Sequence, residues 1–218
     1  MINNLHILDE VNPHEFLDCR HRFLPRAERM VLTMSADRPR HPAWIASMVS
    51  GLKPLLEAEG VSAISQTPEL ALLLEATGAR AVGCWRHREG TLRLAGFLAA
   101  DDMQAIVRAE FIAATWNVPL SATQFGIVQA VAIRGPALNL RAANSSPVEA
   151  GSLGWLARFE AASSLAVPIE REAELWGTIA VATARRIEPD DDVWRLVVAV
   201  AAGLNDSERS APGTSRRG

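Results

Sequence analysis

Residues 163–204 read SSLAVPIEREAELWGTIAVATARRIEPDDDVWRLVVAVAAGL, and this stretch decides the fold. Two apolar segments, Ser164–Ile169 and Leu175–Thr183, flank a polar turn, which predicts a pair of adjacent strands. The acidic run Glu188–Asp192 then precedes the almost wholly apolar segment Val193–Leu204, and carboxylates at that point favour the positive end of a helix. A strand pair followed by an apolar helix predicts a sheet with a helix packed on one face.

Similar patterns occur earlier in the chain. Residues 81–87 and 91–98 predict a hairpin around the turn Arg88-Glu89-Gly90, and 137–140 predict another short strand. Thr67-Pro68 supplies an N-cap and a first-turn proline for a helix that ends at Gly78. Further helices are expected over 101–115, with Asp101 and Asp102 at its amino end, over 123–134 and over 152–160. Strand pairs interleaved with helices predict an α+β fold with an antiparallel sheet.

The 218 residues suffice for one full domain with additions. Apolar residues recur at helical spacing from Pro42 to Glu59, where Gly51 and Pro54 should bend or divide the helix. The predicted segments are a poorly defined extension at 1–40, a helical segment and candidate dimer helix at 41–66, a folded domain at 67–205, and a disordered tail at 206–218.

Composition excludes several classes of function. Hydrophobic residues make up 49% of the chain and the net charge is −3, with both signs scattered, so we expect no direct nucleic-acid partner. Two cysteines, Cys19 and Cys84, are typical of a reduced cytoplasm. The start MINNLHILDE lacks a signal-peptide pattern and no run approaches a membrane span, so we expect neither secretion nor membrane contact.

The ordered motifs resemble the GAF domain family. They are Val-Pro-Ile at 167–169, Leu-Trp-Gly at 175–177, the stretch GIVQAVAIRGPALNL at 126–140, and GARAVGCWRHREGTLRLAGF at 78–97. The resemblance implies a central antiparallel sheet of five to six strands with helices on both faces. It also implies that the first and last helices cover one face and that a small-molecule pocket lies under the middle helices on the other.

Aromatic residues supply most of the pocket candidates, because ligand pockets are mainly apolar with a few polar groups. For any single aromatic residue, a place in the core is the plainer alternative. No cofactor or ligand can be named from these residues. The candidate ligand-binding residues are Trp85, Phe97, Phe125, Arg141, Asn144, Trp155, Phe159 and Ser163.

The sequence gives little support to a catalytic function or to a bound cofactor. Some proteins of the resembled family reduce free methionine sulfoxide, which needs a nucleophilic and a resolving cysteine. Cys84 is alone on a predicted strand and is expected to be a small buried core residue. His87, beside the hairpin turn, is expected to face solvent rather than bind haem. Bilin attachment is not expected either, since no cysteine follows Gly90.

Metal binding is a weak alternative in the extension. His14, Asp18, Cys19 and His21 are residue types that bind zinc, and His14 and Asp18 would share a helix face. A solvated helix face is the plainer interpretation of this pattern.

These features predict a non-enzymatic, cytoplasmic small-molecule sensor. The chain shows no kinase, cyclase or DNA-binding segment, so a separate signalling or transcription protein is expected to carry the output. Apolar residues cover more of helix 193–204 than one sheet face can bury, which predicts a second surface in a homodimer, completed by residues 42–59. The alternatives are an oligomerising adaptor without a ligand or, with less support, a free methionine sulfoxide reductase.

Overall fold

A six-stranded antiparallel sheet forms the centre of the protein. The computed structural model describes residues 42–58, 67–143 and 145–206, so the expectations for 1–40, Asn144 and 207–218 lie outside it. The strands follow the spatial order β3-β2-β1-β6-β5-β4. Their bounds are β1 Ala79–Arg88, β2 Thr91–Ala99, β3 Asn117–Pro119, β4 Ala137–Leu140, β5 Ser163–Arg171 and β6 Glu174–Thr183.

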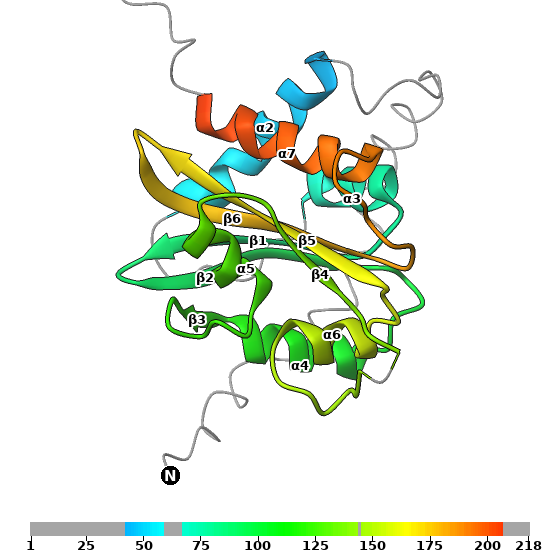
Figure 1. Ribbon diagram of the computed structural model, residues 1–218. Helices are drawn as coiled ribbons and strands as arrows, with labels where there is room; N and C mark the ends of the chain where they lie inside the picture. Colours follow the sequence, from blue (N-terminus) through cyan, green and yellow to red (C-terminus); the bar gives the residue numbers. More distant parts are fainter. Residues whose placement is uncertain (1–41, 59–66, 144, 207–218) are drawn as a thin grey trace, which may run out of the picture. The chain divides into compact units, whose positions relative to one another are not determined.

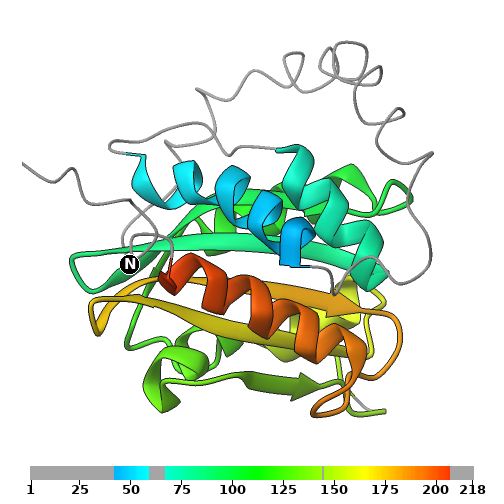
Figure 2. The same ribbon diagram turned by 90° about the horizontal axis from the view of Figure 1, so that it is seen from above.

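Helices cover both faces of this sheet (Figure 1). One layer holds α2 (Pro42–Glu57), α3 (Pro68–Thr77) and α7 (Asp192–Asp206), which lie over the sheet in Figure 2. The other face carries α4 (Ala105–Thr115), α5 (Gly126–Ile133) and α6 (Ser152–Arg158). The expected α+β architecture, with the first and last helices on one face, is confirmed. None of the described helices is both long and apolar enough to cross a bilayer.

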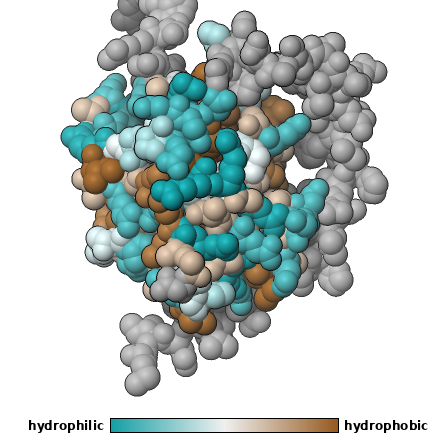
Figure 3. All heavy atoms as spheres, turned by 45° about the vertical axis from the view of Figure 1, so that its right-hand side comes forward, coloured by the Kyte–Doolittle hydropathy of each residue, from teal (hydrophilic) through white to brown (hydrophobic). Residues whose placement is uncertain are grey.

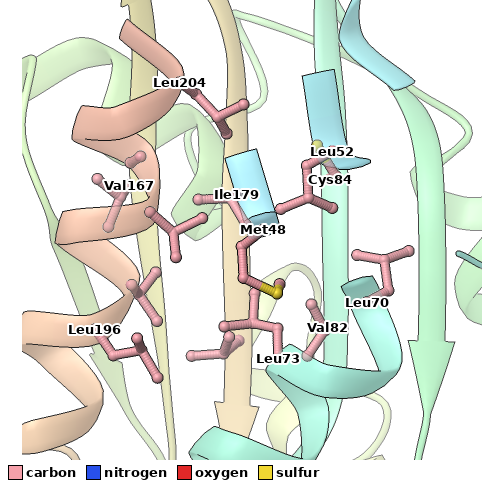
Figure 4. Packing of buried hydrophobic residues seen from close by; sticks show 14 of the residues in the cluster. Met48, Leu52, Leu70, Leu73, Val82, Cys84, Val167, Ile179, Leu196 and Leu204 are labelled. Carbon is pink, nitrogen blue, oxygen red and sulfur yellow. The ribbon is translucent and has the colours of Figure 1, made fainter. Parts of the chain in front are cut away.

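Alternation along β1 separates two hydrophobic clusters. Val82 and Cys84 belong to the cluster under α2, α3 and α7, where Figure 4 shows Cys84 with Leu52. Ala81 and Trp85 belong to the cluster on the opposite face. Because side chains alternate along a strand, neighbouring residues between Ala81 and Trp85 face opposite clusters.

Helix α2 runs without a break from Pro42 to Glu57, so the expected division at Gly51 and Pro54 is wrong. Pro54 occupies the exposed side of the helix, while Leu52, Leu55 and Leu56 on the other side are buried. Burial of this apolar side offsets the backbone hydrogen bond that proline cannot donate.

Helix α4 begins at Ala105, later than predicted, and its first turn carries no carboxylate. The physical reason is a competing partner for Asp102. Both oxygens of Asp102 accept hydrogen bonds from Arg80 Nη1, at 2.6 and 2.7 Å, which holds the carboxylate in the turn before the helix. The three-residue strand β3 was not predicted either, because so short a segment has no detectable alternation.

The same chain supplies much of the second surface that α7 requires. Helix α2 lies against α7, and a Cβ on Gly203 would come within 2.6 Å of a Val49 methyl group, so the two helices approach closely. Leu196, Val197, Val200 and Leu204 are buried in the shared cluster. The apolar circumference of α7 therefore does not by itself require a second copy of the chain.

Candidate functional site

A cavity of about 70 Å³ lies between the sheet and the layer of α4, α5 and α6. Its walls come from β1, β2, β5 and β6 below and from the three helices above. Among the described residues, none that lines the cavity carries a charge at neutral pH, and the hydroxyl-bearing ones are Thr115, Ser152 and Ser164. The site is therefore an apolar pocket with a few polar groups, as small-molecule sites commonly are.

The floor of the cavity consists of small residues on the three central strands. Large side chains at these positions would fill the space, as Leu165, Val167 and Ile179 do on the other face of the same strands. Ser164 and Ala180 remain partly exposed although both strands lie inside the sheet, as expected beneath a hollow. The floor residues are Ala81, Gly83, Ser164, Ala166, Ala180 and Ala182.

The opposite wall is a cluster of aromatic rings centred on Phe111 of α4. The Phe111 ring centroid lies 4.7 Å from that of Phe97, 5.1 Å from Trp155 and 5.0 Å from Phe159. The contacts with Trp155 and Phe159 are edge-on, a geometry that aromatic pairs favour. Trp155 is partly exposed, whereas Phe97, Phe111 and Phe159 are buried.

Trp85 fixes one side of the cavity. Its Nε1 donates a hydrogen bond to the carbonyl oxygen of Thr115 at 3.2 Å, which joins β1 to the last turn of α4. The indole lies over Gly83, where a Cβ would collide with the ring carbons. Glycine at this position therefore allows the tryptophan to lie close against the sheet.

Polar groups gather at the start of α5, where Ser152 and Ser164 line the cavity and Asn139 lies beside the lining residue Gly126. Gly126 N donates to Ser152 Oγ at 2.7 Å, and a Cβ on Gly126 would lie 2.5 Å from Nδ2 of Asn139. This Nδ2 is buried and has no hydrogen-bond partner among the residues that the structure describes. Asn139 pairs in register with Ser164, so both residues lie on the cavity side of their strands. This polar group consists of Asn139, Ser152 and Ser164.

Ion pairs hold helices α4 and α6 in place over the cavity. Arg80 pairs with Asp102 and also donates through Nε to the carbonyl oxygen of Phe159 at 3.1 Å, where α6 ends. Arg158 of α6 pairs with Glu110 of α4 and lies 4.4 Å over the Trp155 ring. The two helices are thus tied to each other and to β1.

The structure brings together Trp85, Phe97, Phe125, Trp155 and Phe159, all five predicted aromatic candidates, as lining residues. Their part in ligand binding stays a prediction. Asn144 lies outside the described residues.

The predicted polar candidates Ser163 and Arg141 are not among the lining residues. Ser163 faces the other side of the sheet, where its Oγ contacts the carbonyl oxygen of Arg185 and the amide of Ile187. Arg141 is exposed and is not a lining residue. Sequence reasoning missed Phe111, Ser152 and Ser164 as lining residues. Alternation could have found Ser164, because Leu165 and Val167 mark the opposite face of β5.

The predicted thiol and histidine lie away from the cavity. Cys84 is fully buried on the other face of the sheet, as expected, and burial raises the pKa of its thiol to about 12. His87 is partly buried, and its Nδ1 lies 3.2 Å from the carbonyl oxygen of Leu175, so the expected solvent-facing position is wrong. Within residues 42–58, 67–143 and 145–206, no group of His, Cys, Asp and Glu side chains could hold a metal ion.

Comparison with solved structures finds likeness in fold. The phycocyanobilin-bound GAF domain from a cyanobacterial phytochrome is 13% identical with a TM-score of 0.50, over 76% of this chain and 91% of that one. The GAF domain from Acinetobacter phosphoenolpyruvate-protein phosphotransferase is 12% identical with a TM-score of 0.47, over 75% and 89%. The reduced fRMsr of Staphylococcus aureus is 13% identical with a TM-score of 0.42, over 74% and 93%.

Comparison at the level of sequence identifies the family. No curated protein matches the chain. The family model of the GAF domain matches residues 66–205, the part of the chain that builds the sheet, the cavity and α3 to α7. The chain therefore belongs to the GAF domain family.

Proposed function

We propose that this protein is a non-enzymatic sensor that binds a small uncharged molecule in the cavity beneath α4, α5 and α6. The observation that carries the proposal is the lining itself, which combines aromatic rings, a floor of small residues and no charged side chain. A charged ligand would leave its charge buried without a counterion, which is costly in an apolar site. Membership of the GAF family supports a ligand-binding or signalling module in general.

The residues around the cavity also support a binding site rather than a catalytic one. The lining residues include no cysteine, histidine or acidic side chain. Cys84 lies on the other face of the sheet, and its raised pKa keeps the thiol protonated at neutral pH. An assay of free methionine sulfoxide reduction tests the enzymatic alternative. We expect negligible turnover both in the parent and in Cys84→Ser, whereas turnover lost in the variant would overturn the proposal.

A route for the signal runs through β1. Trp85 lines the cavity, and the next residue, Arg86, points to the opposite face, where it donates to the carbonyl oxygen of Ala58 beyond the end of α2. Arg86 is buried, with 7% of its surface exposed. A ligand that contacts Trp85 would thereby alter how α2 is held, provided that it binds the two arrangements with different affinity.

We propose that two partners respond to this change in α2, namely a second copy of the chain and a separate signalling or transcription protein in the cytoplasm. Hydrophobic side chains remain partly exposed along α2 and α7, namely Trp44, Ile45, Trp194 and Val198. On the face shown in Figure 3, hydrophilic residues predominate and hydrophobic ones form small groups. A homodimer through α2 and α7 would cover the partly exposed set.

Thermal-shift screening of uncharged and charged metabolites tests the proposed function. A compound that binds the native state must raise the melting temperature. We expect uncharged compounds to stabilise the parent and to have no effect on Ala180→Leu, whose larger side chain would fill the cavity. The control is Ala46→Leu, the same change at an exposed position of α2.

The rival function is an oligomerising adaptor without a ligand, and the volume of the cavity favours it. About 70 Å³ is well below the roughly 300–1,000 Å³ of ordinary ligand pockets. If no compound stabilises the parent, and Ala180→Leu is at least as stable as the parent, the adaptor function replaces the sensor.

A further inference from the structure

We infer that the ligand is a compound with a single planar ring and one hydrogen-bond acceptor, such as an aromatic ketone. This inference rests on the proposed function, because it names the chemical class that the same cavity would bind. Three features carry it, namely a floor of small side chains that faces aromatic rings, the hydrogen-bond donors at the start of α5, and the partly exposed Trp155.

Two opposed surfaces bound the cavity. The floor is the face of a sheet whose side chains extend no further than a methyl or hydroxymethyl group, at Ala166, Ala180 and Ser164. Opposite it stand the aromatic rings of Phe111, Phe159 and Trp155. A planar ring would gain edge and face contacts with these aromatics, while a puckered aliphatic ring of the same size would not lie flat on the sheet.

The polar group of Asn139, Ser152 and Ser164 specifies the acceptor. Asn139 Nδ2 is buried against Gly126, which lines the cavity, and no other described residue gives it a hydrogen-bond partner. Ser152 accepts from the amide of Gly126, so its own hydroxyl proton stays available for donation. A buried donor without a partner is costly, so a ligand oxygen that accepts from this group would be favoured over an apolar group of the same shape.

The size of the cavity identifies the side chain that must move. An apolar cavity of about 150 Å³ accommodates benzene, whereas the space here is about 70 Å³. Trp155 is the partly exposed member of the aromatic cluster, on a short helix, and its outer face is covered by the Arg158 guanidinium. Outward movement of Trp155 would admit one ring without disturbing the buried Phe111 and Phe159.

Isothermal titration with four matched probes tests the inference. Acetophenone has the ring and the acceptor, ethylbenzene lacks the acceptor, cyclohexyl methyl ketone lacks the planar ring, and benzoate adds a charge. We expect acetophenone to bind the parent at least about tenfold more tightly than each of the other three. Ala180→Leu should abolish this binding, Asn139→Leu should weaken it about five- to tenfold, and Ala46→Leu should leave it unchanged.

Each other outcome overturns the inference in a recognisable way. Preference for benzoate or for the aliphatic ketone, lost in Ala180→Leu, would contradict the ligand class while leaving the sensor function in place. Failure of all four probes would also contradict the ligand class, and the metabolite screen would then decide the sensor function separately. If Ala180→Leu does not fold, as judged by circular dichroism, Ala166→Val provides the second filled cavity.

Discussion

The indole Nε1 of Trp85 lies 3.2 Å from the carbonyl oxygen of Thr115, and this hydrogen bond joins β1, one of the three strands of the cavity floor, to the end of α4. Trp85→Phe keeps an aromatic ring but leaves the buried carbonyl without its donor, so we expect the free energy of unfolding to fall by about 1–3 kcal/mol. Urea denaturation of the parent and the variant measures this change. Equal midpoints with equal slopes would show that the bond contributes nothing.

Gly83 permits the position of the Trp85 ring, so enlarging it should displace the ring. A Cβ at this position collides with the indole. We expect Gly83→Ala to cost about 1–3 kcal/mol through overpacking and to move Trp85 into the cavity, so that the ligand is lost. Denaturation together with titration of the acetophenone probe checks this prediction. Unchanged affinity would mean that the ring can lie elsewhere without filling the site.

Burial of Cys84 is expected to make the stability of the folded protein depend on pH in the alkaline range. Its pKa is about 12 in the folded protein against an ordinary value of 9.0, so the unfolded chain loses this proton first. The contribution of Cys84 is fully present below pH 9 and declines as the pH rises towards 12. In a Cys19→Ser background, stability should therefore fall between these values, and Cys84→Ala should remove that part of the decline. Identical alkaline profiles for both proteins would contradict the assignment.

Asp102 is expected to have the opposite effect in the acidic range, where stability should fall as the pH is lowered. The hydrogen bond from Arg80, and secondarily the charge of Arg80, lower the pKa of this carboxyl below its ordinary value of 3.8. A lowered pKa means that its contribution is present above 3.8 and is lost as the pH falls through the folded-state value. The difference in denaturation midpoint between the parent and Asp102→Asn should therefore shrink as acid is added. Because the carboxylate is exposed, we expect a small effect, and a difference that stays constant with pH would exclude this role.

Arg86 is expected to couple the cavity to α2 without contacting the ligand. Arg86→Met retains the aliphatic bulk but removes the hydrogen bond to Ala58. Probe affinity should remain close to that of the parent, while the effect of the probe on hydrogen exchange along α2 should disappear. Loss of probe binding itself would indicate a structural role for Arg86 in place of coupling.

The homodimer is tested by sedimentation. Trp194 is partly exposed on α7, and we expect Trp194→Glu to shift the parent's dimer towards monomer, because a charge at an apolar interface is costly. Ala202→Glu, at an exposed position of the same helix, is the comparison that shows whether the effect is local. A clean monomer for the parent at tens of micromolar would contradict the proposed dimer.

Local patterns in the sequence predicted the layers and most strands. Strand alternation and helix capping both depend on residues that are close in sequence, as Thr67 and Pro68 illustrate for a helix start. The cavity could be predicted only in part. Aromatic residues were evident, but their convergence on Phe111 depends on how α4 crosses the sheet, which no local pattern encodes. Ser163 and Ser164 show most clearly where prediction from sequence fails. The two residues are adjacent but face opposite sides of the sheet, so an error of one residue in register selects the hydroxyl that does not line the cavity.

The start of α4 shows a second limit. Asp101 and Asp102 are residues that commonly cap a helix. Asp102 instead forms an ion pair with Arg80, which is distant in sequence. Tertiary contacts of this kind override local preference, and a single sequence does not reveal them.

The most direct test of the account follows alanine and methionine methyl signals by nuclear magnetic resonance while acetophenone is added. Ala166, Ala180 and Ala182 report on the cavity floor, and Met48 reports on the opposite face of the sheet. Binding in the cavity predicts saturable shifts of the three alanine signals, with that of Met48 moving little, and their absence in Ala180→Leu. Shifts centred on Met48, or none at any concentration, would contradict the account.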